Sequence, residues 1–136
     1  MDGAAWKTVR KLFGNPVLYI WKPMLHHEKL DVYQCAVQFL ALSSQLAAQA
    51  PRGHSALVDQ LKRAALSVPL NIAEAAGKTS DRDSSRSFVI ARGSALECAA
   101  VLDACLILRI GSPERLREGK ELLRRIVCML TKMIHF

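Results

Sequence analysis

The sequence has few aromatic and few turn-forming residues, and these shortages narrow the fold class. Phe, Trp and Tyr make up 6% of the 136 residues, and there are five prolines and seven glycines. Runs rich in Val, Ile, Thr and Tyr, which are typical of strands, are missing apart from a short piece near residue 17. Apolar residues still make up 51% of the chain, mostly as Ala and Leu, which are good helix formers. The composition therefore predicts an all-α protein, and the length fits one domain.

Long apolar segments are also missing. The longest uninterrupted apolar run near the start extends from Val17 to Trp21, far short of the about 20 residues of a membrane-spanning helix. Basic residues precede this run as in a signal peptide, but the run is too short, and Pro16, Lys22 and Pro23 interrupt it. We therefore expect a cytoplasmic protein that does not bind a membrane.

The cysteines do not have the spacing of a metal site. They stand at positions 35, 98, 105 and 128, without a C-x-x-C pair and without a His at zinc-ligand spacing. We expect all of them to be buried free thiols in a reducing compartment.

Patterns typical of catalysis are scarce. Ser94 is not in a G-x-S-x-G motif, and no strand precedes it. The four histidines fall at predicted helix ends or loops, where a preorganised base is not expected. Glu74 and Glu97 could form a carboxylate pair as in di-metal bundles, but no Glu-x-x-His accompanies them. We expect no enzymatic activity, no metal and no cofactor.

Turn signals divide the chain into an N-terminal arm and four helical segments. The arm, residues 1–27, carries aromatic residues that could pack on the bundle or on a partner, or belong to a loose tail or an upstream translation start. Periodicity predicts helices over 28–49, 55–76, 80–110 and 113–136. We expect Ser55, Ser80 and Ser112 to cap helices, and Gly77 and Gly111 to end them. Short turns favour an up-down-up-down four-helix bundle over residues 28–136.

Each predicted helix carries apolar residues at spacings of three and four, which indicates one buried stripe. The predicted core residues are Val32, Ala36, Phe39, Ser43 and Leu46; Leu57, Leu61, Ala64, Val68, Ile72 and Ala75; Phe88, Ala91, Ala95, Leu96, Ala99, Leu102, Cys105 and Leu108; and Leu116, Leu123, Val127, Leu130 and Ile134. Pro69 should kink the second helix, because its nitrogen cannot donate and its ring displaces the Ala65 carbonyl. Ser67 and Asn71 could satisfy the released carbonyl groups or organise water there.

The charge is strongly positive. The formal net charge of +7 and the pI near 9.6 favour acidic partners, above all RNA or DNA. At about 100° per residue, Arg117, Lys120 and Arg124 fall within roughly 60° of one another on the last helix, and Arg125 follows them. Such a stripe can follow a phosphate backbone. The alternative is a solvated face with local ion pairs, such as Glu121 with Arg125.

A second basic point lies on the second predicted helix, at Lys62 and Arg63. These residues could contact nucleic acid. Alternatively, Arg63 could pair with Glu74 or Glu97 in a half-buried network that stabilises the bundle or a subunit interface.

The stretch from Gln60 to Ala75 closely resembles the Q-L-x-R-A-x-x-S-x-P-x-N-I-A-E-G core of a known four-helix bundle family, the 23S rRNA intervening-sequence proteins. Leu30-Asp31-Val32-Tyr33-Gln34 resembles its first-helix opening, and residues 88–97 resemble its third-helix signature. The match covers about residues 29–135 in the right order. The family glycine after Asn-Ile-Ala-Glu is replaced here by Ala75-Ala76, with Gly77 two positions late, and residues 1–27 have no counterpart.

The resemblance implies a four-helix bundle that assembles as a ring-shaped homopentamer. Related proteins include the accessory variability determinants of diversity-generating retroelements, which bind nucleic acid as partners of a reverse transcriptase. The resemblance thus implies a nucleic-acid-binding accessory protein, and the alternative is a structural or adaptor homo-oligomer whose main partner is another protein. We expect five motif residues to hold helices or subunits together rather than to touch a ligand: Pro69, Asn71, Glu74, Arg92 and Glu97.

Overall fold

The computed structural model describes residues 25–136. A 3-10 turn, η2 (His26–Lys29), precedes four helices: α2 (Asp31–Gln49), α3 (Ser55–Ala76), α4 (Asp81–Ile107) and α5 (Pro113–Met133). This part of the chain contains no strand, which confirms the predicted all-α class. The predicted N-terminal arm lies outside the described residues as far as residue 24.

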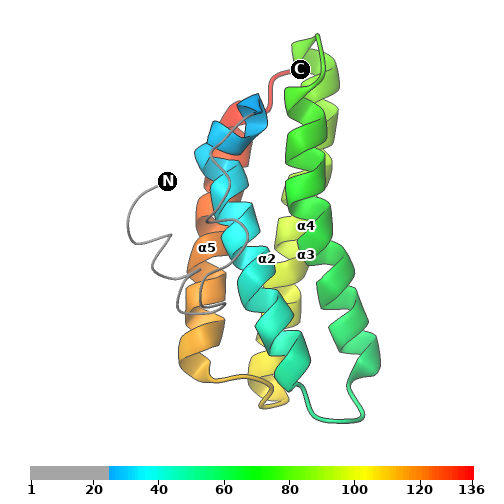
Figure 1. Ribbon diagram of the computed structural model, residues 1–136, viewed down its shortest axis with the longest axis vertical. Helices are drawn as coiled ribbons and strands as arrows, with labels where there is room; N and C mark the ends of the chain where they lie inside the picture. The colour runs from blue at the N-terminus through cyan, green and yellow to red at the C-terminus, as the bar shows by residue number, and fades with distance from the viewer. Residues whose placement is uncertain (1–24) are drawn as a thin grey trace.

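The four helices form a bundle in which each helix packs on two others (Figure 1). α3 packs against α2 and α4, and α5 also packs against α2 and α4. α2 and α4 therefore occupy opposite corners of the bundle, as do α3 and α5. None of these helices combines the length and the apolarity that a membrane crossing requires.

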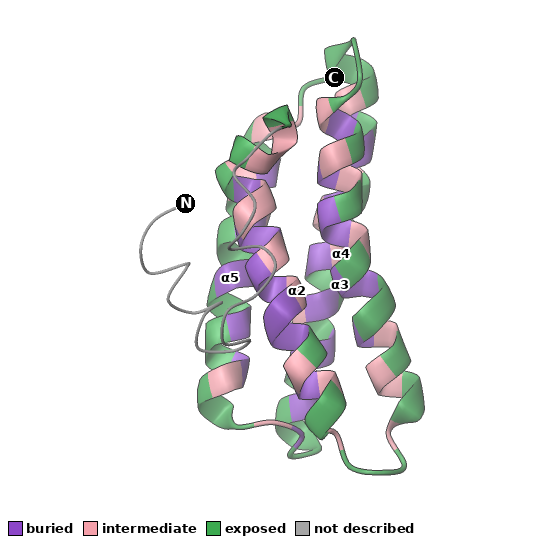
Figure 2. Ribbon diagram, viewed as in Figure 1, coloured by how far each residue is buried: buried purple, intermediate pink, exposed green. Residues whose placement is uncertain are grey.

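The core lies where the four apolar stripes meet, and Figure 2 shows the buried positions facing inward along each helix. Most of the predicted core residues are buried, including Phe39, Ile72 and Leu102, each at 1% exposure or less. Two predictions are wrong: Leu96 and Leu108 are 54% and 48% exposed. Leu96 lies on the side of α4 that faces away from the core, and Leu108 comes after the last helical residue. Four more are only half-buried: Leu57, Ala99, Val127 and Ile134.

Hydrogen bonds fix where the helices begin. The Ser80 and Ser112 hydroxyls accept from the backbone N–H groups three residues later, at 3.2 Å in each case, so both predicted caps are confirmed. The prediction for Ser55 is wrong, because His54 occupies the cap position and makes no side-chain cap bond. The first helix begins at Asp31 rather than at residue 28, since Glu28 belongs to the preceding 3-10 turn.

The ends of α3 and α4 differ from the sequence-based expectation. Gly77 caps α3 with a φ of −88°, so no left-handed conformation requires the glycine there. α4 stops at Ile107, before the predicted Gly111, because Arg109 turns the chain with a φ of +58°. Ile110 N–H then donates to the Cys105 carbonyl at 2.9 Å, which with the Arg109 N–H bond to Leu106 makes a Schellman cap.

Pro69 is buried inside α3, and this helix bends partway along its length (Figure 1). The Asn71 amide donates to the Ser67 carbonyl at 2.8 Å and to the Ser67 hydroxyl at 3.0 Å. Ser94 of α4 donates to the same hydroxyl at 2.8 Å. The polar neighbours of the proline thus link α3 to α4, and the Asn71 amide bonds to Ser67 rather than to the Ala65 carbonyl.

Three of the four cysteines are buried free thiols, as predicted. Cys128 is exposed on α5, so the prediction is wrong for this residue. It lies on the solvent side of an amphipathic helix, two positions before the buried Leu130.

Candidate nucleic-acid interface

The candidate site is the outer side of α5, which is strongly amphipathic. Pro113 at the first helical position and Glu114 in the first turn favour helix initiation after the Ser112 cap. One side of the helix is buried, by Leu116, Gly119, Leu122, Leu123, Ile126 and Leu130. We call the exposed cations opposite them the α5 basic face: Arg117, Lys120, Arg124, Arg125 and Lys132.

Lys120 is tied to the neighbouring helix. Its Nζ lies 2.7 Å from Asp103 Oδ1 of α4, and both side chains remain 44% and 68% exposed. Such an exposed pair contributes little stability, roughly 0–1 kcal/mol, because water screens it. The pair does, however, neutralise part of the predicted stripe.

Arg124 is paired within α5. Its Nε and Nη2 donate to the two carboxylate oxygens of Glu121 at 2.9 and 2.6 Å, a two-pronged arrangement. This hydrogen bonding lowers the pKa of Glu121 and raises the pKa of Arg124. Glu121 therefore pairs with Arg124, not with Arg125 as the alternative interpretation expected. The predicted sorting of the charges into separate flanks is wrong at this point, since an acid lies directly on the stripe.

Arg117 and Arg125 are exposed, and neither makes an ion pair or hydrogen bond within residues 25–136. Lys132, in the last turn of the helix, is likewise exposed and was not predicted. It follows Arg125 by seven residues, two helical turns, and this spacing is the signal that could have identified it. The three cations are available to an external anion.

Lys62 and Arg63 do not join this face. They lie on α3, at the corner of the bundle opposite α5. Lys62 is exposed, whereas Arg63 donates to Gln60 Oε1 at 2.8 Å, and Gln60 Nε2 in turn donates to the Glu97 carboxylate of α4. Arg63 thus belongs to a network between α3 and α4, and it reaches Glu97 through Gln60 rather than by a direct pair.

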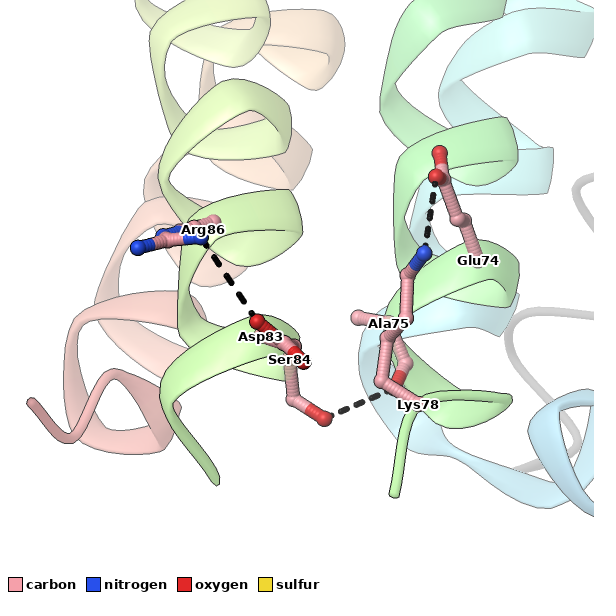
Figure 3. A network of polar contacts seen from close by, with 6 residues as sticks. All are labelled: Glu74, Ala75, Lys78, Asp83, Ser84 and Arg86. Atoms are coloured by element: carbon pink, nitrogen blue, oxygen red, sulfur yellow. Dashed lines mark hydrogen bonds and ion pairs between the residues drawn. The ribbon is translucent and has the colours of Figure 1, made fainter. Parts of the chain in front are cut away.

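The predicted link between Arg63 and Glu74 is not formed. Glu74 instead pairs with Lys78, one turn later in the same helix, at 3.4 Å (Figure 3). The two ends of α3 and α4 are joined nearby by the Ser84 hydroxyl, which donates to the Ala75 carbonyl at 2.9 Å. Glu74 therefore does not hold two helices together in this chain.

The other predicted structural residues do connect helices. Arg92 of α4 donates to the Thr131 hydroxyl of α5 at 3.4 Å, and Asn71 and Glu97 contribute to the α3–α4 contacts described above. Within residues 25–136, no group of three or more His, Cys, Asp or Glu side chains could hold a metal ion. The arrangement offers cationic donors along a helix.

Comparison with known proteins agrees with this architecture. No curated protein matches the chain. A family model described as 23S rRNA-intervening sequence protein matches residues 28–132, which include all four helices. The chain belongs to the 23S rRNA-intervening sequence protein family.

Proposed function

We propose that the protein is a non-catalytic accessory protein that binds RNA through the α5 basic face. The observation that carries the proposal is that Arg117, Arg125 and Lys132 are exposed on one helix without acid partners in the described part of the chain. Cations free of internal partners can release counterions from a phosphate backbone. The family description, which refers to ribosomal RNA, supports RNA as the polyanion.

The chemistry of this face favours phosphate contacts over base recognition. α5 contains no aromatic residue, so it offers no platform on which unstacked bases could stack. Arginine and lysine along a straight helix contact successive phosphates and position the protein on the strand. We therefore propose a folded or duplex RNA, bound with little sequence preference.

The resemblance supplies the finer parts of the proposal. The RNA is then either a ribosomal RNA insert or the template of a diversity-generating retroelement, in which case a reverse transcriptase is the protein partner. Both reactions place the protein in the cytoplasm.

The experiment measures RNA binding by fluorescence anisotropy with a labelled hairpin, across a series of salt concentrations. The double variant Arg117→Ala/Arg125→Ala should bind more weakly, and the slope of log K against log salt should fall by about two contacts, at roughly 0.7–0.9 per contact. The matched control is Lys62→Ala/Arg82→Ala, which removes two exposed cations that lie outside α5. Absence of binding at low ionic strength, or an equal loss in both double variants, contradicts the proposal.

The second candidate is a homo-oligomeric adaptor whose main partner is a protein, and the resemblance implies a ring of five chains. Exposed apolar side chains on α4 favour it: Ile90 and Leu96 are each 54% exposed, and Ile107 is 80% exposed. Light scattering gives the mass of the assembly. A protein that stays bound after nuclease treatment, in the absence of RNA binding, favours this candidate over the first.

A further inference from the structure

α4 carries two apolar stripes, of which only one faces the core of its own bundle. The inner stripe is buried and consists of Phe88, Ala91, Ala95, Cys98, Leu102 and Cys105. A second series alternates spacings of four and three on the solvent side, and we call it the outer seam: Arg86, Ile90, Gly93, Glu97, Ala100, Ala104 and Ile107. This 3.5-residue repeat is the pattern with which one helix packs along another. The outer seam has no helix of its own chain against it in the described residues.

Gly93, near the middle of the outer seam, has no explanation within the chain. A Cβ at this position would meet nothing within 4 Å, and the residue does not have a positive φ. An exposed glycine inside a helix costs about 1 kcal/mol relative to alanine. Glycine is used where another backbone comes close. Together with Ala100 and Ala104, it leaves room for a second helix between the exposed side chains of Ile90 and Ile107.

The charges of the outer seam identify the second helix. Arg86 lies at the N-terminal end of the seam, and Asp103 lies beside its C-terminal end. Two copies of α4 laid antiparallel bring each Arg86 close to the Asp103 of the other copy, whereas a parallel pair brings like charges together. The same register sets Ile90 against Ala100 of the second copy and Glu97 over Gly93 of the second copy, so large and small side chains alternate.

We infer that α4 pairs antiparallel with α4 of a second copy of this chain through the outer seam. Arg86 and Asp103 now hold partners on their own chain, at 3.7 Å to Asp83 (Figure 3) and at 2.7 Å from Lys120. Both pairs are exposed and weak, so exchange with the second copy costs little.

This inference deepens the second candidate and does not depend on RNA binding, because the outer seam and the α5 basic face lie on different helices. A helix that pairs with its own copy makes a two-fold contact, while a ring of five joins two different faces of each chain. The outer seam therefore gives a dimer if it acts alone, or two rings joined face to face if rings also form.

The test is light scattering across a dilution series, on the full chain. The wild type should have a mass that is an even multiple of the 15.0 kDa chain. Ile90→Glu should halve the mass. The matched control Ala48→Glu adds the same charge at an exposed position of α2, at the opposite corner of the bundle, and should leave the mass unchanged.

A charge exchange separates a contact from a merely structural effect. Arg86→Asp and Asp103→Arg should each weaken the association, and the double variant should restore it. Gly93→Ala should also weaken association although it favours the helix. A wild type that is a single chain or a five-chain particle at every concentration overturns the inference. So does a double variant that stays dissociated while circular dichroism shows it folded.

Discussion

Gly119 of α5 lies so close to Leu102 of α4 that a Cβ on the glycine would stand 2.8 Å from Leu102 Cδ1. The same Cβ would lie 3.2 Å from Leu42 and 3.4 Å from Phe39, both of α2. All three side chains are buried and cannot swing into solvent. The glycine thus permits α2, α4 and α5 to meet in the core.

Gly119→Ala should destabilise the protein by about 1 kcal/mol. Overpacking a filled core costs roughly 1–3 kcal/mol, and the better helix propensity of alanine returns about 1 kcal/mol of this. Urea unfolding measures the difference. Gly93→Ala, measured at a dilution where the chains are single, is the matched control and should be stabilising, since its Cβ meets nothing. An equal gain in both variants would show that the core yields at Gly119.

Arg109→Gly should stabilise the chain by about 1 kcal/mol. Arg109 has a φ of +58°, which costs a residue with a side chain roughly 1–2 kcal/mol, whereas glycine adopts it freely. The thermal midpoint should therefore rise. Leu108→Gly is the control: its φ is −84°, so glycine there brings only the loss of backbone entropy and should lower the midpoint.

Ser85→Ala should release the C-terminal segment. The buried Ser85 hydroxyl lies 2.6 Å from both the backbone N and the carbonyl O of His135. Loss of these bonds leaves buried polar groups unpaired, at a cost of about 1–3 kcal/mol. Hydrogen exchange at the His135 amide should accelerate. Ser44→Ala, at an exposed position, should leave that amide protected.

Thiol reagents should distinguish Cys128 from the other cysteines. At neutral pH the folded protein should react at Cys128 alone, because Cys35, Cys98 and Cys105 are buried. All four should react in denaturant. Mass spectrometry after limited alkylation identifies the modified residue, and rapid labelling of Cys98 in the folded state would mean that the core opens readily.

Alkaline pH should destabilise the protein through Cys98. Burial, with a smaller contribution from the charge of Glu97, raises the pKa of Cys98 from 9.0 to about 12. The raised pKa means that the unfolded chain loses this proton first. The stability is complete below pH 9.0 and falls from there toward pH 12, by about 1.4 kcal/mol per pH unit for one proton. Cys98→Ala should lose this part of the pH dependence, whatever its stability at neutral pH.

The candidate site was predictable only in part. The amphipathic pattern and the Ser112-Pro113 signal place α5 and its cations correctly, because both depend on neighbours along the chain. The pairing of Lys120 with Asp103 joins residues 17 positions apart and depends on how α4 and α5 pack. The separation of Lys62 from the α5 basic face has the same origin, since it follows from the corner that each helix occupies.

The sequence by itself determined the helical class, the order of the helices, most of the buried stripes and two of the three predicted caps. These features follow from a period of 3.6 residues and from hydrogen bonds that span three or four residues. Tertiary structure alone decided which of the chemically similar residues differ in environment. Gly119 is buried against Leu102 while Gly93 faces open space, and Leu102 is buried while Leu96 is exposed. Local periodicity allows either member of such a pair to face inward, and only the packing of the other three helices selects one.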